Sequence, residues 1–152
     1  MSKREEFAQA LKQALKGKDQ VAMSTIRLMT AALKDRDIAA RGQGQPDGIG
    51  EAEILSMLQS MIKQRQESSK MYEDNGRPEL AERERAEIAV IEGFLPAQMS
   101  DEQVAAVIEK IIGEVGAASI KDMGKVMGQL KSHYAGQLDM ARAGAVVKTK
   151  LG

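Results

Sequence analysis

The chain has 152 residues, of which 43% are hydrophobic and 29% are charged, a balance typical of a globular protein rather than a disordered one. Its 22 basic and 22 acidic residues give a formal net charge of zero, so the chain as a whole is not a polycation that binds nucleic acid by bulk charge. It contains no cysteine, which excludes disulfides, thiol nucleophiles and zinc–thiolate sites.

The hydrophobic spacing of the first 95 residues is that of amphipathic α-helices. It predicts four helices, over 2–16, 19–41, 51–75 and 78–94, with a glycine-rich loop at 42–50 and a turn at Asn75-Gly76. We expect the first two to bury Phe7, Leu11 and Leu15, and Met23, Ile26, Leu33 and Ile38, respectively. Four such helices joined by short loops form a helical bundle.

A helix stop and a new helix start follow each other closely after residue 94. Pro96 disfavours helical geometry at the residue before it, and Ser100 with Gln103 has the spacing of a capping box. This predicts a joint between two domains, an N-terminal four-helix bundle-like domain (1–95) and a small C-terminal domain (96–152). An ordinary turn inside one bundle is the alternative.

The C-terminal region also reads as helical. Its pattern predicts three helices, the first closing at Gly113, the second running from Ser119 or Ile120 to about Tyr134, and the third capped by Asp139. No stretch shows the two-residue alternation of a strand, so the predicted fold class is all-α.

Residues able to carry out covalent chemistry are scarce. His133 is the only histidine, and no metalloprotease, phosphate-loop or serine-hydrolase motif is present. We therefore assign no catalytic residue, no metal site and no cofactor. The charged, amphipathic start has no apolar signal core and no segment could span a bilayer, so we expect a cytoplasmic protein without a membrane partner.

The last third of the chain is basic. From residue 119 onward, two aspartates stand against six basic residues, which is an excess of four positive charges: Lys121, Lys125, Lys131, Arg142, Lys148 and Lys150. On a helical projection that starts at Lys121, the first three point away from the apolar stripe. These six residues are the candidate nucleic-acid-binding residues, because ammonium and guanidinium groups bind phosphates. A solvated charged helix face is the alternative.

Several segments of the chain resemble the YqeY family, in the right order along nearly the whole length. They are Ser24-Thr25-Ile26-Arg27-Leu28, Lys63-Gln64-Arg65-Gln66-Glu67-Ser68, Gly76-Arg77-Pro78-Glu79-Leu80-Ala81, Phe94-Leu95-Pro96-Ala97-Gln98-Met99-Ser100, Asp122-Met123-Gly124-Lys125-Val126-Met127 and Ala135-Gly136-Gln137-Leu138-Asp139-Met140. The resemblance implies a four-helix N-terminal region and a small helical C-terminal region. Similar domains form the tail of the GatB subunit of glutamine-dependent tRNA amidotransferase, where they are associated with holding tRNA.

These observations lead to one main hypothesis, a non-catalytic accessory protein that binds tRNA or another structured RNA through the six basic residues. The alternatives are a component of a carbon–nitrogen ligase with glutamine as amide donor, and a scaffold for a protein partner. Amide transfer needs a nucleophile and an ATP–magnesium site, and the sequence shows neither.

Overall fold

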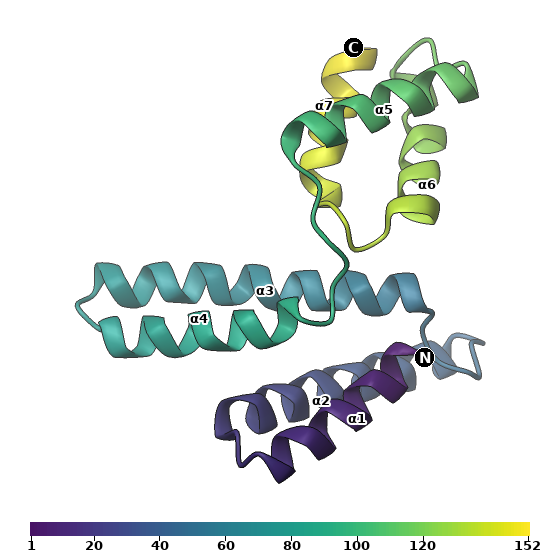
Figure 1. Ribbon diagram of the computed structural model, residues 1–152. Helices are drawn as coiled ribbons and strands as arrows, with labels where there is room; N and C mark the ends of the chain where they lie inside the picture. The colour runs from purple at the N-terminus through teal and green to yellow at the C-terminus, as the bar shows by residue number, and fades with distance from the viewer. The chain divides into compact units, whose positions relative to one another are not determined.

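The computed structural model describes residues 1–152 and contains helices but no strand, which confirms the all-α prediction (Figure 1). Its contacts divide the chain into two compact units, residues 1–95 and residues 96–152, called here the first and second unit. The elements are α1 (Lys3–Lys16), α2 (Gln20–Gly42), α3 (Glu51–Asp74), α4 (Pro78–Glu92), α5 (Asp101–Val115), a 3-10 turn η1 (Ile120–Asp122), α6 (Met123–Tyr134) and α7 (Met140–Leu151).

Side-chain caps set the starts of four helices. The Ser2 hydroxyl accepts the Glu5 N–H at 3.2 Å, and Asp19 and Asp139 accept N–H groups in the first turns of α2 and α7. At α5 both bonds of the predicted capping box are present, with Ser100 and Gln103 each accepting the other's backbone N–H at 3.2 and 2.9 Å. Each cap pairs N–H groups that the helix itself leaves free.

The predicted end of α5 at Gly113 is wrong, because the helix continues to Val115. A glycine inside a helix costs only about 1 kcal/mol, which the burial of Ile108 and Ile111 on the same helix outweighs. The helix ends at Gly116, whose φ of +67° is the left-handed geometry that closes helices and that glycine adopts without strain.

The first unit consists of two helical hairpins, α1–α2 and α3–α4 (Figure 1), whose buried side chains form one hydrophobic core. Phe7 meets Phe94 edge to face at 5.1 Å between ring centroids, which ties α1 to the segment after α4. The largest buried side chains of this unit are Met29, Ile54, Met57, Leu58 and Ile91.

Two residues expected in this core are on the surface instead. Leu15 is 47% exposed and Ile38 is 55% exposed. Ile38 lies about 140° around the α2 axis from the buried Leu33, since each residue turns the helix by about 100°. Leu15 belongs to the last turn of α1, about 80° away from the buried Phe7.

A buried carboxylate fixes the loop between α2 and α3. Asp37 is only 8% exposed and accepts hydrogen bonds from an Arg4 guanidinium nitrogen at 2.6 Å and from the Ile49 N–H at 2.9 Å. Burial by itself would raise the pKa of Asp37, but these bonds and the Arg4 charge outweigh it and lower the pKa below its usual value. Residues 43–50 are thus held against α2 by a charge that the sequence pattern did not single out.

A second polar link joins α3 to α4. Arg65 donates to the Glu87 carboxylate at 2.9 Å and to the Met61 carbonyl at 3.2 Å, with both charged side chains about seven-eighths buried. Burial, together with the neighbouring Glu87 charge, raises the pKa of Glu84, which lies one turn before Glu87.

In the second unit α5, α6 and α7 enclose a small core of Ile108, Ile111, Val126, Leu130, Leu138, Ala143 and Val147. The segment before α5 is fastened to the α6–α7 turn, because the Met99 N–H donates to the Gln137 carbonyl at 2.8 Å and the Gln98 amide to the Gly136 carbonyl at 2.6 Å. By length and hydropathy, none of the helices in either unit could cross a membrane.

Candidate nucleic-acid interface

The six basic residues predicted to bind phosphate lie on three elements of the second unit. Lys121 is in η1, Lys125 and Lys131 are in α6, and Arg142, Lys148 and Lys150 are in α7. All six are exposed residues. They differ in whether they form an ion pair with a carboxylate, and this difference divides them into two groups of three.

Three of the six have a carboxylate partner. The Lys150 ammonium lies 2.7 Å from Glu109, and the Arg142 guanidinium lies 3.6 Å from Asp101, so α7 is linked twice to α5. The Lys125 ammonium is 4.0 Å from Asp122, three residues before it. Arg142 and Lys125 remain more than two-thirds exposed, whereas the Lys150 side chain is only 27% exposed.

The other three, Lys121, Lys131 and Lys148, are exposed and form no ion pair with a carboxylate. Their ammonium groups are free to meet an external anion, and no internal salt bridge has to break first. They are therefore the strongest phosphate-binding candidates among the six predicted residues.

The local structure around Lys121 differs from the continuous helix used for the projection. Residues 120–122 form a 3-10 turn, in which the Asp122 carboxylate accepts the Ala118 and Ser119 N–H groups at 3.0 and 3.4 Å. These bonds, supported by Lys125, lower the pKa of Asp122. Because α6 begins only at Met123, the projection that treats Lys121 and Lys125 as parts of one continuous α-helix does not apply.

The acidic residues of α5 change the charge of this region. Within the second unit the seven basic residues face six acidic ones, a net charge of only +1. Four of those acids are on α5: Asp101, Glu102, Glu109 and Glu114. The basic excess is thus confined to η1, α6 and α7. The missed signal was the acidic content of 101–114, which the count from residue 119 left out.

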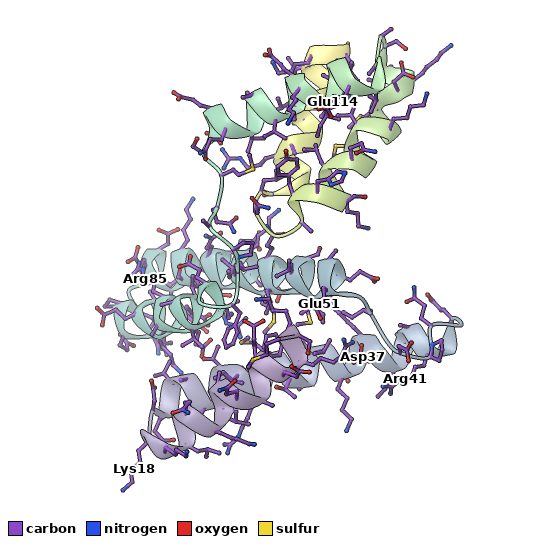
Figure 2. All side chains as sticks on the ribbon, turned by 45° about the vertical axis from the view of Figure 1, so that its right-hand side comes forward. Lys18, Asp37, Arg41, Glu51, Arg85 and Glu114 are labelled. Carbon is purple, nitrogen blue, oxygen red and sulfur yellow. The ribbon has the colours of Figure 1, made fainter.

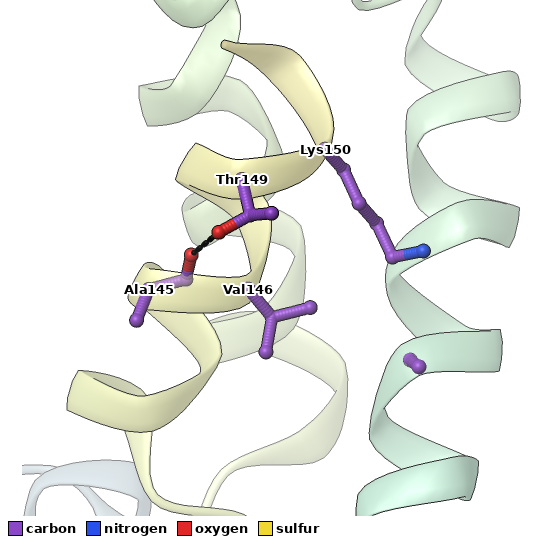
Figure 3. Close-up of a pocket in the computed structure, with 5 residues that line it drawn as sticks. Ala145, Val146, Thr149 and Lys150 are labelled. Carbon is purple, nitrogen blue, oxygen red and sulfur yellow. Dashed lines mark hydrogen bonds between the residues drawn. The ribbon is translucent and has the colours of Figure 1, made fainter.

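Two open hollows lie between α5 and α7. One, of about 400 Å³, is lined by Ala105, Ala145, Val146, Thr149 and Lys150, and the Lys150 side chain reaches along its edge toward α5 (Figure 3). The other, of about 590 Å³, shares Ala145 and Val146 with it and has Arg142 and Asp101 in its lining. No three histidine, aspartate or glutamate side chains of the chain are grouped to hold a metal ion.

This architecture is that of a small all-helical protein whose C-terminal unit carries exposed cations on η1, α6 and α7. The chain belongs to the Yqey-like protein family, whose model matches residues 4–151. The match extends over both units, and it establishes the family that the sequence segments resembled.

Curated relatives occur in yeasts under the name "Altered inheritance of mitochondria protein 41, mitochondrial". The protein from Lachancea thermotolerans is 32% identical over 56% of this chain and 43% of its own length. The proteins from Vanderwaltozyma polyspora and Saccharomyces cerevisiae S288c are 28% and 25% identical over 74% and 79% of this chain, and over 62% and 65% of their own lengths. The chain thus spans less than two thirds of each relative. The names of these relatives describe them as mitochondrial proteins. The cytoplasmic location expected for this chain stays a prediction.

Proposed function

We propose that this YqeY-family protein is a non-catalytic accessory protein that binds tRNA or a similarly structured RNA through the phosphate backbone. The observation that carries the proposal is the set of three exposed lysines, Lys121, Lys131 and Lys148, that no carboxylate neutralises. Lys125 and Arg142, whose ion pairs are long and highly exposed, can join them when phosphate competes for their charge.

Backbone contact suits this surface better than base readout. The chain has only two tyrosines and two phenylalanines and no tryptophan. Phe7 and Phe94 are engaged with each other in the first unit, and neither tyrosine is among the exposed residues. Recognition of single-stranded bases depends on exposed aromatic side chains, whereas a folded RNA can be held by shape and phosphate contacts alone.

The test is the salt dependence of binding to total tRNA, measured by fluorescence anisotropy or filter binding with the full chain. Each phosphate neutralised contributes roughly 0.7 to 0.9 to the log–log slope of affinity against salt. The triple variant K121A/K131A/K148A should therefore lower that slope by about 2 to 3 units and weaken binding at low salt. Lys131 and Lys148 lie in α-helices, where alanine has the highest helix propensity, so these substitutions should leave α6 and α7 folded.

A matched control removes the same charge elsewhere. Lys63, Lys70 and Lys110 are exposed lysines outside the candidate surface, of which only Lys110 has an ion pair, a long and exposed one to Glu114 at 4.0 Å. K63A/K70A/K110A lowers the net charge by the same three units. The control should keep the wild-type slope. Equal losses in both triple variants would reduce the effect to net charge and overturn the proposed surface, and a flat slope for the wild-type chain would overturn RNA binding itself.

The two alternatives from the sequence give different results. A ligase component predicts glutamine hydrolysis or amidation of a charged tRNA by the purified chain. A protein scaffold predicts a partner whose co-purification survives both high salt and nuclease, since neither would remove a contact that does not depend on RNA.

A further inference from the structure

The two hairpins of the first unit carry opposite charge. Residues 1–50, which contain α1 and α2, have nine basic and six acidic residues, a net charge of +3. Residues 51–95, which contain α3 and α4, have six basic and ten acidic residues, a net charge of −4. The sum is close to neutral, so counting charge over whole domains conceals a basic hairpin next to an acidic one.

On α2 the basic residues form a row. Arg27, Lys34 and Arg41 are seven residues apart, so each lies about 20° around the helix axis from the previous one and about 10.5 Å further along it. The row lies on a flank of α2, outside its buried face, since its three positions are about 60° to 140° around the axis from the buried Ile26, Leu33 and Ala40 of the same helix. Three cations thus line an exposed strip about 21 Å long.

None of the three cations has a carboxylate partner of its own, although the Arg41 charge helps to lower the pKa of Asp37. All are exposed, and none takes part in an ion pair. Asp37 is a buried acid on the same helix, and its carboxylate already accepts hydrogen bonds from Arg4 and from the Ile49 N–H. Arg41 donates only to a backbone carbonyl, that of Pro46, at 3.3 Å.

The rest of the hairpin adds more free cations. Lys12 and Lys16 lie one turn apart on α1, and Lys18 follows in the α1–α2 turn; all three are exposed and without an ion pair. Figure 2 shows Lys18 at the tip of the hairpin, pointing away from the chain, and Arg41 toward the other end of α2. The hairpin therefore presents more unpaired cations than the predicted surface of the second unit.

An RNA backbone fits this hairpin better than an anionic membrane. Helices that lie on membranes insert a broad apolar face rich in large side chains. The apolar side of α2 is already used for the core, and its outer surface exposes only three large apolar residues and no aromatic one: Val21, Leu28 and Ile38. A row of cations without ion pairs, carried on one helix with little exposed apolar surface, matches an extended row of phosphates.

We propose that the α1–α2 hairpin is a second phosphate-binding surface for RNA, with the Arg27–Lys34–Arg41 row at its centre. The identity of the ligand rests on the proposed function, but the location does not, because it depends on different residues in the other unit. An RNA held at two linked surfaces is bound more tightly than by either alone.

The experiment compares R27Q/K34Q with K63Q/K70Q in the full chain, using total tRNA as the probe. Both variants remove two charges from exposed helix positions without an ion pair, and Arg41 is left intact to keep its bond to the loop. R27Q/K34Q should lower the salt slope by about 1.4 to 1.8 units and weaken binding at low salt, whereas K63Q/K70Q should leave both unchanged. Circular dichroism verifies that both variants stay folded.

A photocrosslinking amino acid at Ala31, an exposed position between Arg27 and Lys34, identifies what covers the face; Ser60 on α3 serves as the control position. RNase-sensitive RNA adducts from position 31 and not from position 60 support the proposal. An unchanged slope in R27Q/K34Q, or protein adducts in place of RNA adducts, would overturn it. Binding of the same variant to phosphatidylserine vesicles is measured in parallel, and a loss of vesicle binding with tRNA binding intact would also overturn the proposal. A slope lowered by R27Q/K34Q but not by K121A/K131A/K148A would instead overturn only the C-terminal surface.

Discussion

The Lys150 ammonium lies 2.7 Å from the Glu109 carboxylate, so a residue predicted to bind phosphate serves to join α7 to α5. Its hydrogen bond and its charge lower the pKa of Glu109, so the carboxylate stays ionised to a lower pH than that of an unpaired glutamate. Lys148, two residues earlier on the same helix, is exposed without any such partner. Lys148 and Lys150 should therefore contribute differently to RNA binding, although they are only two residues apart.

The first prediction compares K148A with K150A. Loss of Lys148 should lower the salt slope of tRNA binding by roughly 0.7 to 0.9, the contribution of one phosphate contact. Loss of Lys150 should lower it by less than half as much, because its charge is already shared with Glu109, and should slightly lower the melting temperature. Equal effects of the two substitutions on the slope would show that the ion pair opens readily for RNA.

The second prediction concerns the loop that Asp37 holds. Gly48 has a φ of +82°, and a Cβ at this position would collide with the Asp37 carboxylate that binds Arg4 and Ile49. Gly48→Ala should cost about 2 to 4 kcal/mol of unfolding free energy, combining backbone strain with a disturbed buried bond. In urea melts, Gly44→Ala is the control: its φ is +91° but its Cβ would meet no atom within 4 Å. It should cost about 1 kcal/mol, and similar costs for both variants would contradict the model of the loop.

The third prediction is a pH effect at Glu84. Its pKa in the folded chain is raised by burial and by Glu87, so the folded state binds this proton more readily than the unfolded state does. The charged form is thus unfavourable at neutral pH, and this penalty disappears as the pH falls through the folded pKa and then below the unfolded value of about 4.3. Glu84→Gln should raise the melting temperature at pH 7 and have little effect near pH 4.

Glu82→Gln, an exposed position two residues earlier on α4, is the matched control. It removes the same charge and retains helix propensity. If the two variants behave alike across this pH range, overall charge and not the surroundings of Glu84 determines the effect.

The fourth prediction tests the two-domain organisation, which the contact division at residues 95 and 96 supports but which stays a prediction until the parts are separated. Gln98 and Met99 are bonded to the α6–α7 turn, so Pro96 and Ala97 are left as the joint. Limited proteolysis should cut near these residues and release two helical fragments. Cleavage within α4 or α5 at a similar rate would indicate that the units do not fold as separate domains.

The sequence alone predicted the local structure well. The helix starts at Ser2, Asp19, Ser100 and Asp139 were correct because a cap depends on residues within three positions of it. The all-α class followed from apolar spacing for the same local reason. The family was recognisable from short segments, and the match over residues 4–151 confirmed it.

Only the tertiary structure decided which side chains are buried and which charges are free. Glu109 and Lys150 are 41 residues apart, and Arg4 and Asp37 are 33 apart, so neither pair is visible in a local pattern. Ile38 looked like a core residue but is exposed, because burial depends on which helix faces pack together. A charge binds an external phosphate only if no neighbouring helix has supplied a carboxylate, and that is settled by packing between segments distant in sequence.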